Sequence, residues 1–244
     1  MQSIRKDHYR PGNSQILTTS ALCLILLSSV VTADDYVEFA TNLPAGTKCV
    51  VDVRMLRPTQ FAVGMKEVHM RVEKLKAKDL KAALNRYLLK KIMPIVIGPG
   101  GIPYVLDHHH LARVLLEAGC RTTLYAEVRE NCSQLTESEF WKMLKKKNWV
   151  FLYDEVGRGP LDTAQLPKTI GELRDDPYRS VSWVVREGGG YLETDTPYAE
   201  FQWANFFRTK IPLEMVRTNF EGAVDKAMTL TSSKEAEKLP GYRK

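Results

Sequence analysis

The chain has 244 residues, of which 44% are hydrophobic and 26% are charged, and its formal net charge is +6. This composition is typical of a globular protein that buries one core or slightly more, and it excludes a low-complexity or repeat chain. The excess of Lys and Arg suits anionic partners such as phosphates, nucleic acids or acidic surfaces, although a solvated basic face would give the same charge.

The first 33 residues are predicted to be a secretory signal peptide. A positive start with Arg5, Lys6 and Arg10 precedes an apolar run over residues 16–31. The run is short for a membrane span of roughly 20 residues, and Ala33 suits a signal peptidase. We therefore expect cleavage after Ala33, a secreted protein, and no stable membrane association of the mature chain. An uncleaved anchor is the alternative.

Cleavage would remove Cys23 and leave three cysteines, Cys49, Cys120 and Cys132. An odd number permits at most one internal disulfide. Cys120 and Cys132 flank a predicted strand over 122–129, whose extended length exceeds the roughly 5.5 Å between Cα atoms that a disulfide needs. A bridge from Cys49 to either partner, or no bridge, stays open.

The rest of the chain alternates predicted strands and helices up to residue 132 and is mainly helical after it. The first group consists of a loop over 36–47, a strand over 49–54, helices within 63–92 that break near Asp79, strands over 94–97 and 102–106, a helix over 107–118 and a strand over 122–129. The second consists of a helix over 136–147, a strand over 150–153, an aromatic core helix over 201–207 and a helical stretch over 213–238. The chain is therefore predicted to be α+β, with one domain over 34–132 and a mainly helical region over 133–244 packed on it.

Three consecutive histidines, His108, His109 and His110, begin the helix that follows the glycine turn over 98–101. Asp107 is the predicted N-cap of this helix. A helix start offers unpaired backbone N–H groups and a partial positive charge, which suit a phosphate. Imidazole adds hydrogen-bond donors and acts as an acid or base near neutral pH. Because consecutive helical residues point about 100° apart, we expect one or two histidines to face a ligand and another to be structural.

A metal site and a surface run are the alternatives for these histidines. No HExxH spacing or CxxC pair supports a metal site, so we predict no metal ligands here. A surface run is the simpler alternative, but this run stands at the end of a predicted buried hairpin. The candidate site is therefore placed at the helix start.

Several stretches follow one another in an order that carries a family resemblance. They are Val51-Asp52-Val53-Arg54, Leu56-Arg57-Pro58-Thr59-Gln60, Pro94-Ile95-Val96-Ile97, Gly100-Gly101, Tyr104 and Asp107-His108-His109-His110-Leu111-Ala112. Over residues 48–130 the chain resembles the ParB/sulfiredoxin superfamily, most closely its branch of putative ParB-like nucleases, to which the final Leu-Pro-Gly-Tyr is also similar. The resemblance implies a small mixed sheet with helices, and a helix start that binds nucleotide phosphates.

The chain departs from two relatives at this helix start. ParB proteins have arginines there and sulfiredoxins have a Gly-Cys-His-Arg box, whereas this chain has histidines and no cysteine. No helix-turn-helix signature follows. The resemblance therefore implies neither chromosome partitioning nor sulfinic-acid reduction, and it leaves the fold and the phosphate-binding helix start.

The candidate site residues follow from the helix start and the resemblance together. The candidate catalytic residues are His108, His109, His110, Asp107 and, as a base, Glu67. The candidate phosphate-binding residues are Gly100, Gly101, His108, His109, Arg113, Arg54 and Gln60.

Three functions fit such a site. The first is hydrolysis of phosphodiesters, the nuclease activity that the resemblance implies. The second is nucleotide-dependent phosphotransfer, which export disfavours because nucleoside triphosphates are scarce outside cells. The third is binding of a nucleotide or nucleic acid without turnover, marked by a steep salt dependence. Nucleotides and nucleic acids are thus the candidate partners and Mg²⁺ the candidate cofactor, and no oligomeric state follows from the sequence.

Overall fold

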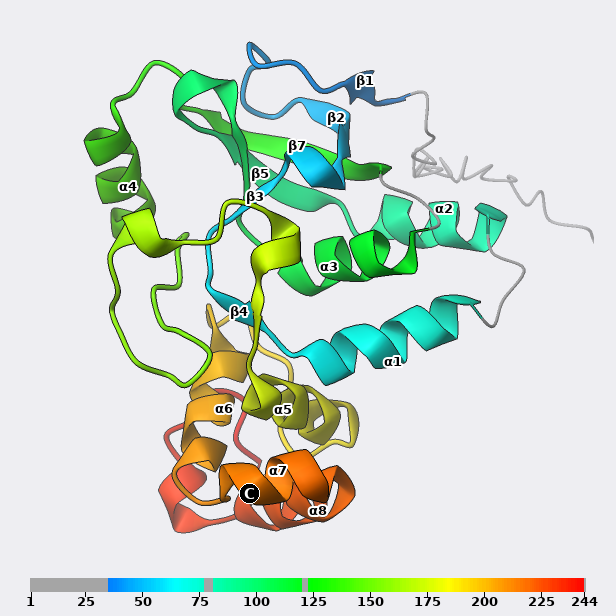
Figure 1. Cartoon of the computed structure of the whole chain (residues 1–244), viewed down its shortest axis with the longest axis vertical. Helices are drawn as coiled ribbons and strands as arrows, with labels where there is room; N and C mark the ends of the chain where they lie inside the picture. Colours follow the sequence, from blue (N-terminus) through cyan, green and yellow to red (C-terminus); the bar gives the residue numbers. More distant parts are fainter. Residues whose placement is uncertain (1–34, 77–80, 120–122, 244) are drawn as a thin grey trace, which may run out of the picture. The chain divides into compact units, whose positions relative to one another are not determined.

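The computed structural model describes residues 35–76, 81–119 and 123–243, which belong to one compact unit (Figure 1). The predicted signal peptide, the helix break near Asp79 and Cys120 lie outside these residues. Within the described chain, no helix is long and apolar enough to cross a membrane.

A six-stranded mixed sheet lies in the first half of the chain (Figure 1). Its strands, in spatial order, are β1 (Val37–Glu38), β2 (Lys48–Asp52), β7 (Thr123–Asn131), β5 (Met93–Ile97), β6 (Pro103–Val105) and β3 (Arg57–Pro58). β2 pairs with β7 and β5 with β6 in antiparallel orientation, whereas β5 and β7 are parallel. The predicted hairpin across the glycine turn is thereby confirmed. A second sheet pairs β4 (Ala62–Val63) with β8 (Arg174–Asp175).

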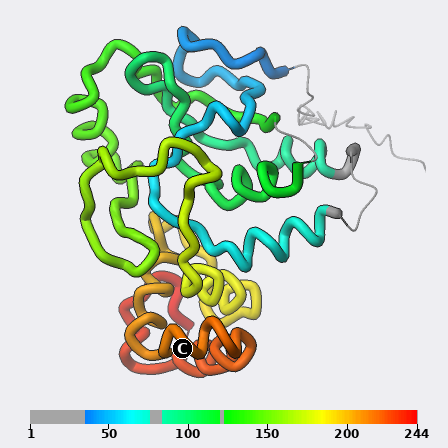
Figure 2. The backbone as a smooth tube through the Cα atoms, in the orientation of Figure 1, coloured from blue at the N-terminus to red at the C-terminus, as the bar shows by residue number. Residues whose placement is uncertain are grey.

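Helices surround this sheet and make up most of the C-terminal region, as predicted (Figure 2). The α-helices of the described chain are α1 (Met65–Lys76), α2 (Lys81–Lys90), α3 (His109–Ala118), α4 (Glu137–Lys146), α5 (Pro177–Glu187), α6 (Ala199–Arg208), α7 (Leu213–Thr218) and α8 (Phe220–Leu230). Its 3-10 helices include η2 (Val53–Met55), η3 (Pro99–Gly101), η4 (Thr163–Gln165), η5 (Ile170–Glu172) and η6 (Lys234–Ala236).

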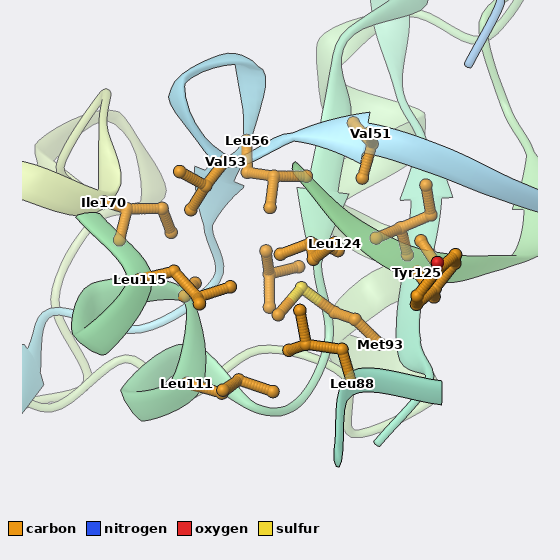
Figure 3. Close-up of a cluster of buried hydrophobic side chains, with 14 of the residues drawn as sticks. Val51, Val53, Leu56, Leu88, Met93, Leu111, Leu115, Leu124, Tyr125 and Ile170 are labelled. Atoms are coloured by element: carbon orange, nitrogen blue, oxygen red, sulfur yellow. The ribbon is translucent and has the colours of Figure 1, made fainter. Parts of the chain in front are cut away.

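The sheet buries a core on each face because successive residues of a strand point to opposite sides. Ile95 of β5 belongs to the larger cluster. Leu88 of α2 and Leu115 of α3 lie in the same cluster (Figure 3). Its neighbour Val96 belongs instead to the cluster that contains Phe140 of α4. The first face therefore carries α1, α2 and α3, and the opposite face carries α4.

Helices α5 to α8 bury a core of their own. Trp203 and Phe207 of α6 are fully buried in it, together with Val181 of α5. The prediction that the aromatic residues of this helix form core is confirmed for these two positions.

Two local predictions are wrong. Asp107 is not the N-cap of α3, because His108 takes that position in the left-handed conformation, and Asp107 Oδ1 instead accepts the N–H of His108 at 2.6 Å. The stretch over 150–153 is not a strand, since it makes a single bridge between Phe151 and Gln60. The ring of Phe151 stacks on Phe201 at 4.2 Å, so the apolar run serves packing rather than a sheet.

Cys49 and Cys132 are buried free thiols, so the open alternative of a bridge between them is not realised. The boundary predicted at residues 132 and 133 stays a prediction. Strand β8, which lies beyond that boundary, pairs with β4 from before it.

Candidate functional site

A cleft of about 810 Å³ lies at the start of α3. It is lined by residues 107–111, by α1 and α5, and by the segment 191–201 that leads into α6. Its positive side chains come from distant parts of the chain: Arg71, Lys91, Arg129, Arg179 and Arg186. The cleft therefore brings the three histidines together with positive side chains that are distant in the sequence. The most distant is Arg186, 78 residues after His108.

The backbone of the cleft is strained at three points. Among the described residues other than glycine, His108, Asn148 and Tyr198 have a positive φ, of 67°, 55° and 58°, and all three line the cleft. This conformation is uncommon for residues with a side chain, and such residues cluster at functional sites. The hydroxyl of Tyr198 donates to the carbonyl of Asn148 at 3.0 Å, so two of the three are joined directly. The strain supports this cleft as the functional site.

The first turn of α3 presents backbone donors to the cleft. The helix starts at His109, and the side chain of its N-cap, His108, makes no capping hydrogen bond. The first N–H groups of a helix have no partner within the helix, and they carry the positive end of its dipole. Because residues 107–111 line the cleft, these groups are of the kind that binds an anion.

His109 and His110 hold α3 in place. His109 Nε2 accepts the N–H of Thr59 at 3.1 Å, and His110 Nε2 accepts the N–H of Gly64 at 2.9 Å. Burial lowers the pKa of His109 to about 3 and lowers the pKa of His110 well below its usual value, with Arg179 adding to the second effect. Both imidazoles are therefore neutral, and because each Nε2 is an acceptor, the proton is on Nδ1.

His108 differs from its two neighbours. Its side chain is 30% exposed, and its Nδ1 lies 3.9 Å from Asp107 Oδ2. Burial lowers the pKa of His108, Asp107 acts in the opposite direction, and Lys91 and Arg71 lower it further. At neutral pH the imidazole is thus uncharged and able to accept a proton. All three histidines line the cleft, but among them only His108 makes no hydrogen bond that anchors α3 to another part of the chain.

Glu67 is engaged by arginines. It is 1% exposed, and its two oxygens lie 2.7 Å from Arg71 Nη2 and 3.1 Å from Arg179 Nη1. His110 Nε2 lies 3.3 Å from the same carboxylate. A carboxylate with both oxygens bound to guanidinium groups is not free to take a proton from a substrate. The arrangement favours a structural role for Glu67 over the role of base.

Two predicted phosphate-binding residues, Gln60 and Arg113, donate hydrogen bonds to other parts of the chain. Gln60 lines the cleft, but its Nε2 donates to the carbonyl of Ala62 at 2.7 Å. Arg113 lies on α3, where its guanidinium donates to Glu117 at 2.8 Å and to the carbonyl of Leu173 at 2.9 Å. Arg113 therefore fastens α3 to the segment before β8 rather than facing a ligand.

Three further candidates are not among the residues that line the cleft. Arg54 forms an ion pair of 2.5 Å with Asp52 at the start of η2, where its side chain is mostly exposed. Gly100 and Gly101 turn the chain between β5 and β6 with φ values of 69° and 77°. A Cβ on Gly101 would lie 2.5 Å from the Thr41 side chain, so this glycine permits close packing. The structure assigns both glycines to the turn.

The sequence interpretation missed the cationic wall of the cleft. Arg71 lies on α1, and Arg179 and Arg186 lie two turns apart on α5. Each occupies a position on an amphipathic helix where a charged residue is ordinary, so no local pattern distinguishes it. Among the described residues, no group of three His, Cys, Asp or Glu side chains is placed to hold a metal ion.

Comparisons with known proteins show the family to which the chain belongs. The sequence profile of the family described as putative ParB-like nuclease matches residues 49–209, which include the first turn of α3 and both arginines of α5. The chain belongs to this family. No curated protein matches the chain significantly.

Two solved structures are similar. Protein Atu1540 from Agrobacterium tumefaciens is 32% identical, with a TM-score of 0.72 over 80% of this chain and 97% of that one. The C-terminally truncated chromosome-partitioning protein ParB from Caulobacter crescentus, complexed with CTP-gamma-S, is 12% identical, with a TM-score of 0.29 over 78% and 95%. Family membership rests on the profile and on the Agrobacterium structure, because the second likeness is too weak to carry an argument.

Proposed function

We propose that the protein hydrolyses phosphodiester bonds, with the reacting phosphate at the first turn of α3 and His108 as the residue that moves the proton. One observation carries this proposal: a single cleft holds the unpaired backbone donors of a helix start and the one histidine of the run whose imidazole is partly exposed. Membership of a family described as putative ParB-like nuclease supports the same reaction class.

The reaction assigns a separate task to each part of the cleft. The N–H groups of α3 stabilise the negative charge that grows on the non-bridging phosphate oxygens. Arg71 and Lys91 add positive charge beside them. The neutral His108 accepts a proton from the attacking water while the new P–O bond forms. The old P–O bond breaks on the opposite side of the phosphorus, where the leaving oxygen takes a proton from solvent water, and the imidazolium later returns its proton to solvent.

Turnover of three substrates tests the proposal. The full chain would be incubated with bis-p-nitrophenyl phosphate, single-stranded DNA and RNA, each with and without Mg²⁺. His108→Ala should lower the rate about 10²-fold or more, the usual contribution of acid–base catalysis. His69→Ala is the matched control, because His69 is an exposed histidine of α1 outside the cleft. Equal rates for the two variants would exclude His108 from the chemistry.

The same assay separates the other functions. Transfer of a phosphoryl group from a nucleotide to an acceptor other than water would make the protein a phosphotransferase. Salt-sensitive binding of nucleotide or nucleic acid with no product would make it a binding protein. Either result would replace the hydrolase proposal while leaving the phosphate site at α3.

Export is the second part of the proposal, and it rests on the sequence of the first 33 residues. Expression with a secretion-competent host, followed by mass spectrometry of the protein in the medium, should give a mature chain that begins at Asp34. A chain that stays in the cell with Met1 or its neighbours in place would contradict export.

A further inference from the structure

The wall of the cleft formed by α5 and α6 holds a carboxylate between two arginines. Arg179 and Arg186 are seven residues apart on α5, which places them on one face of the helix, two turns from each other. Both contact the carboxylate of Glu200, which belongs to the first turn of α6. All three side chains line the cleft, so the clamp borders the space where a ligand would lie.

Each arginine of the clamp also contacts a further carboxylate. Arg179 binds Glu67, which is 1% exposed, in addition to Glu200, which is 19% exposed. Arg186 also contacts Glu187 and Glu193, but these side chains are 56% and 84% exposed, so water screens them.

One donor of this wall has no partner. Arg179 is 6% exposed, and its Nε is buried without a hydrogen bond. A buried donor without a partner is costly, and a phosphate, which has more acceptor oxygens and more charge than the carboxylate of Glu200, could satisfy it.

The clamp is connected to the phosphate site at α3. His110, in the first turn of α3, lies 3.3 Å from Glu67, and Glu67 is bound at 3.1 Å by Arg179. Arg179 in turn holds Glu200. Arg179 therefore contacts both Glu67, which lies next to the first turn of α3, and Glu200 of the clamp.

We propose that Arg179 and Arg186 form a second anion site, in which Glu200 occupies the place of a ligand phosphate, so that the ligand of the cleft carries two linked phosphate groups. This inference rests on the proposed function, because the first phosphate is the one held at α3. Entry of the second phosphate displaces Glu200 from the arginines and frees the first turn of α6. Linked phosphates occur in a pyrophosphate unit and in successive nucleotides of a strand, and both provide this chemistry.

Calorimetric titration of the full chain with inorganic phosphate and with pyrophosphate tests the second site. Glu200→Gln removes the competing charge and should tighten pyrophosphate binding about tenfold, within the range measured for close charge pairs, while phosphate binding changes little. Arg186→Gln should reduce the affinity for pyrophosphate to that for phosphate. Glu187→Gln is the matched control, because Glu187 loses the same charge beside the same arginine but lies outside the cleft-lining residues. Its affinities should equal those of the unaltered chain.

The titrations distinguish failure of the second anion site from failure of the phosphate site at α3. If Glu200→Gln binds pyrophosphate no more tightly than Glu187→Gln, the second site is wrong while the α3 site stands. If the unaltered chain binds neither anion, both are wrong. A 5′-phosphorylated dinucleotide that binds more tightly than pyrophosphate would assign the two phosphates to a strand, and the reverse order would assign them to a pyrophosphate unit.

Amide hydrogen exchange on the unaltered chain tests independently whether pyrophosphate displaces Glu200. It remains usable if Glu200→Gln does not fold. Pyrophosphate should speed the exchange of the amides of Phe201 and Gln202, which donate to the carbonyl of Tyr198 in the first turn of α6. Unchanged or slower exchange there, with pyrophosphate bound, would show that Glu200 stays in its place and would overturn the proposal.

Discussion

Replacing the buried His109 should change how the stability of the protein depends on pH. In the folded chain the pKa of His109 is lowered to about 3 by burial, whereas an unfolded histidine has its ordinary value of about 6.5. The folded protein keeps this imidazole neutral, and the unfolded chain protonates it below pH 6.5. The stability that His109 confers is therefore complete above pH 6.5 and is lost as the pH falls from there towards 3.

The size of the effect follows from the two pKa values. Each unit of difference corresponds to about 1.36 kcal/mol, so at pH 5 the loss due to His109 is about 2 kcal/mol. His110, whose pKa is also lowered, adds to the loss in the same direction. In His109→Gln the amide oxygen can still accept the N–H of Thr59, but nothing titrates at this position.

Urea unfolding at about pH 7.5, 6 and 5 measures the difference. Between the first and the last pH, His109→Gln should lose about 2 kcal/mol less free energy of unfolding than the unaltered chain. His69→Gln, at an exposed position of α1, should behave as the unaltered chain does. If His109→Gln and the unaltered chain lose the same free energy within about 0.5 kcal/mol, His109 is not buried in its neutral form.

Three other substitutions test the packing around the cleft. Gly241→Ala should destabilise the protein by well over 1 kcal/mol, because a Cβ there would lie 2.0 Å from the carbonyl oxygen of Leu192. Gly46→Ala, at a similar φ of 84° but in open surroundings, should cost about 1 kcal/mol, and equal losses in thermal unfolding would contradict the clash at Gly241. Glu67→Gln should lower the free energy of urea unfolding by about 3–5 kcal/mol, because the buried guanidinium of Arg179 loses the charge of its partner. A loss below about 1 kcal/mol would show that the ion pair between Glu67 and Arg179 is not buried. His108→Gly should relieve backbone strain and raise stability by up to about 1 kcal/mol while turnover falls, and a clear loss of stability would show that the His108 side chain is structural.

Local patterns were sufficient to predict most of the elements that carry the site. The hairpin of β5 and β6 follows from two short apolar runs around a glycine turn, and the end of α3 follows from Gly119, which adopts the left-handed conformation expected of a helix C-terminus. The stretch over 150–153 was predicted wrongly because a run of aromatic and β-branched residues suits a strand and a packed loop equally. Only the packing of Phe151 on Phe201 decides between the two.

The site itself was predictable in position but not in the tasks of its residues. The sequence places three histidines at a helix start, yet the partners of His109 and His110 are backbone groups of Thr59 and Gly64, about 50 residues earlier in the chain. Arg54 shows the opposite case, because a nearby carboxylate, that of Asp52, engages it outside the cleft. Such pairings depend on tertiary contacts that no periodicity records.

The division of tasks among the histidines also determines how binding and catalysis respond to pH. Because His109 and His110 stay neutral between about pH 5.5 and 8, they add no charge to the cleft there, and its positive charge comes from arginines, from Lys91 and from the dipole of α3. A phosphodiester keeps its single charge over the same range, so its affinity should hardly vary. Turnover should instead fall as the pH decreases through the pKa of His108, which burial places below the ordinary 6.5, because the protonated imidazole can no longer accept a proton from water. Measured on bis-p-nitrophenyl phosphate, kcat should therefore follow pH while KM stays nearly constant. If KM also varies with pH in His108→Ala over this range, another histidine contributes to binding, and the assignment of His109 and His110 to fixed, neutral anchors would be wrong.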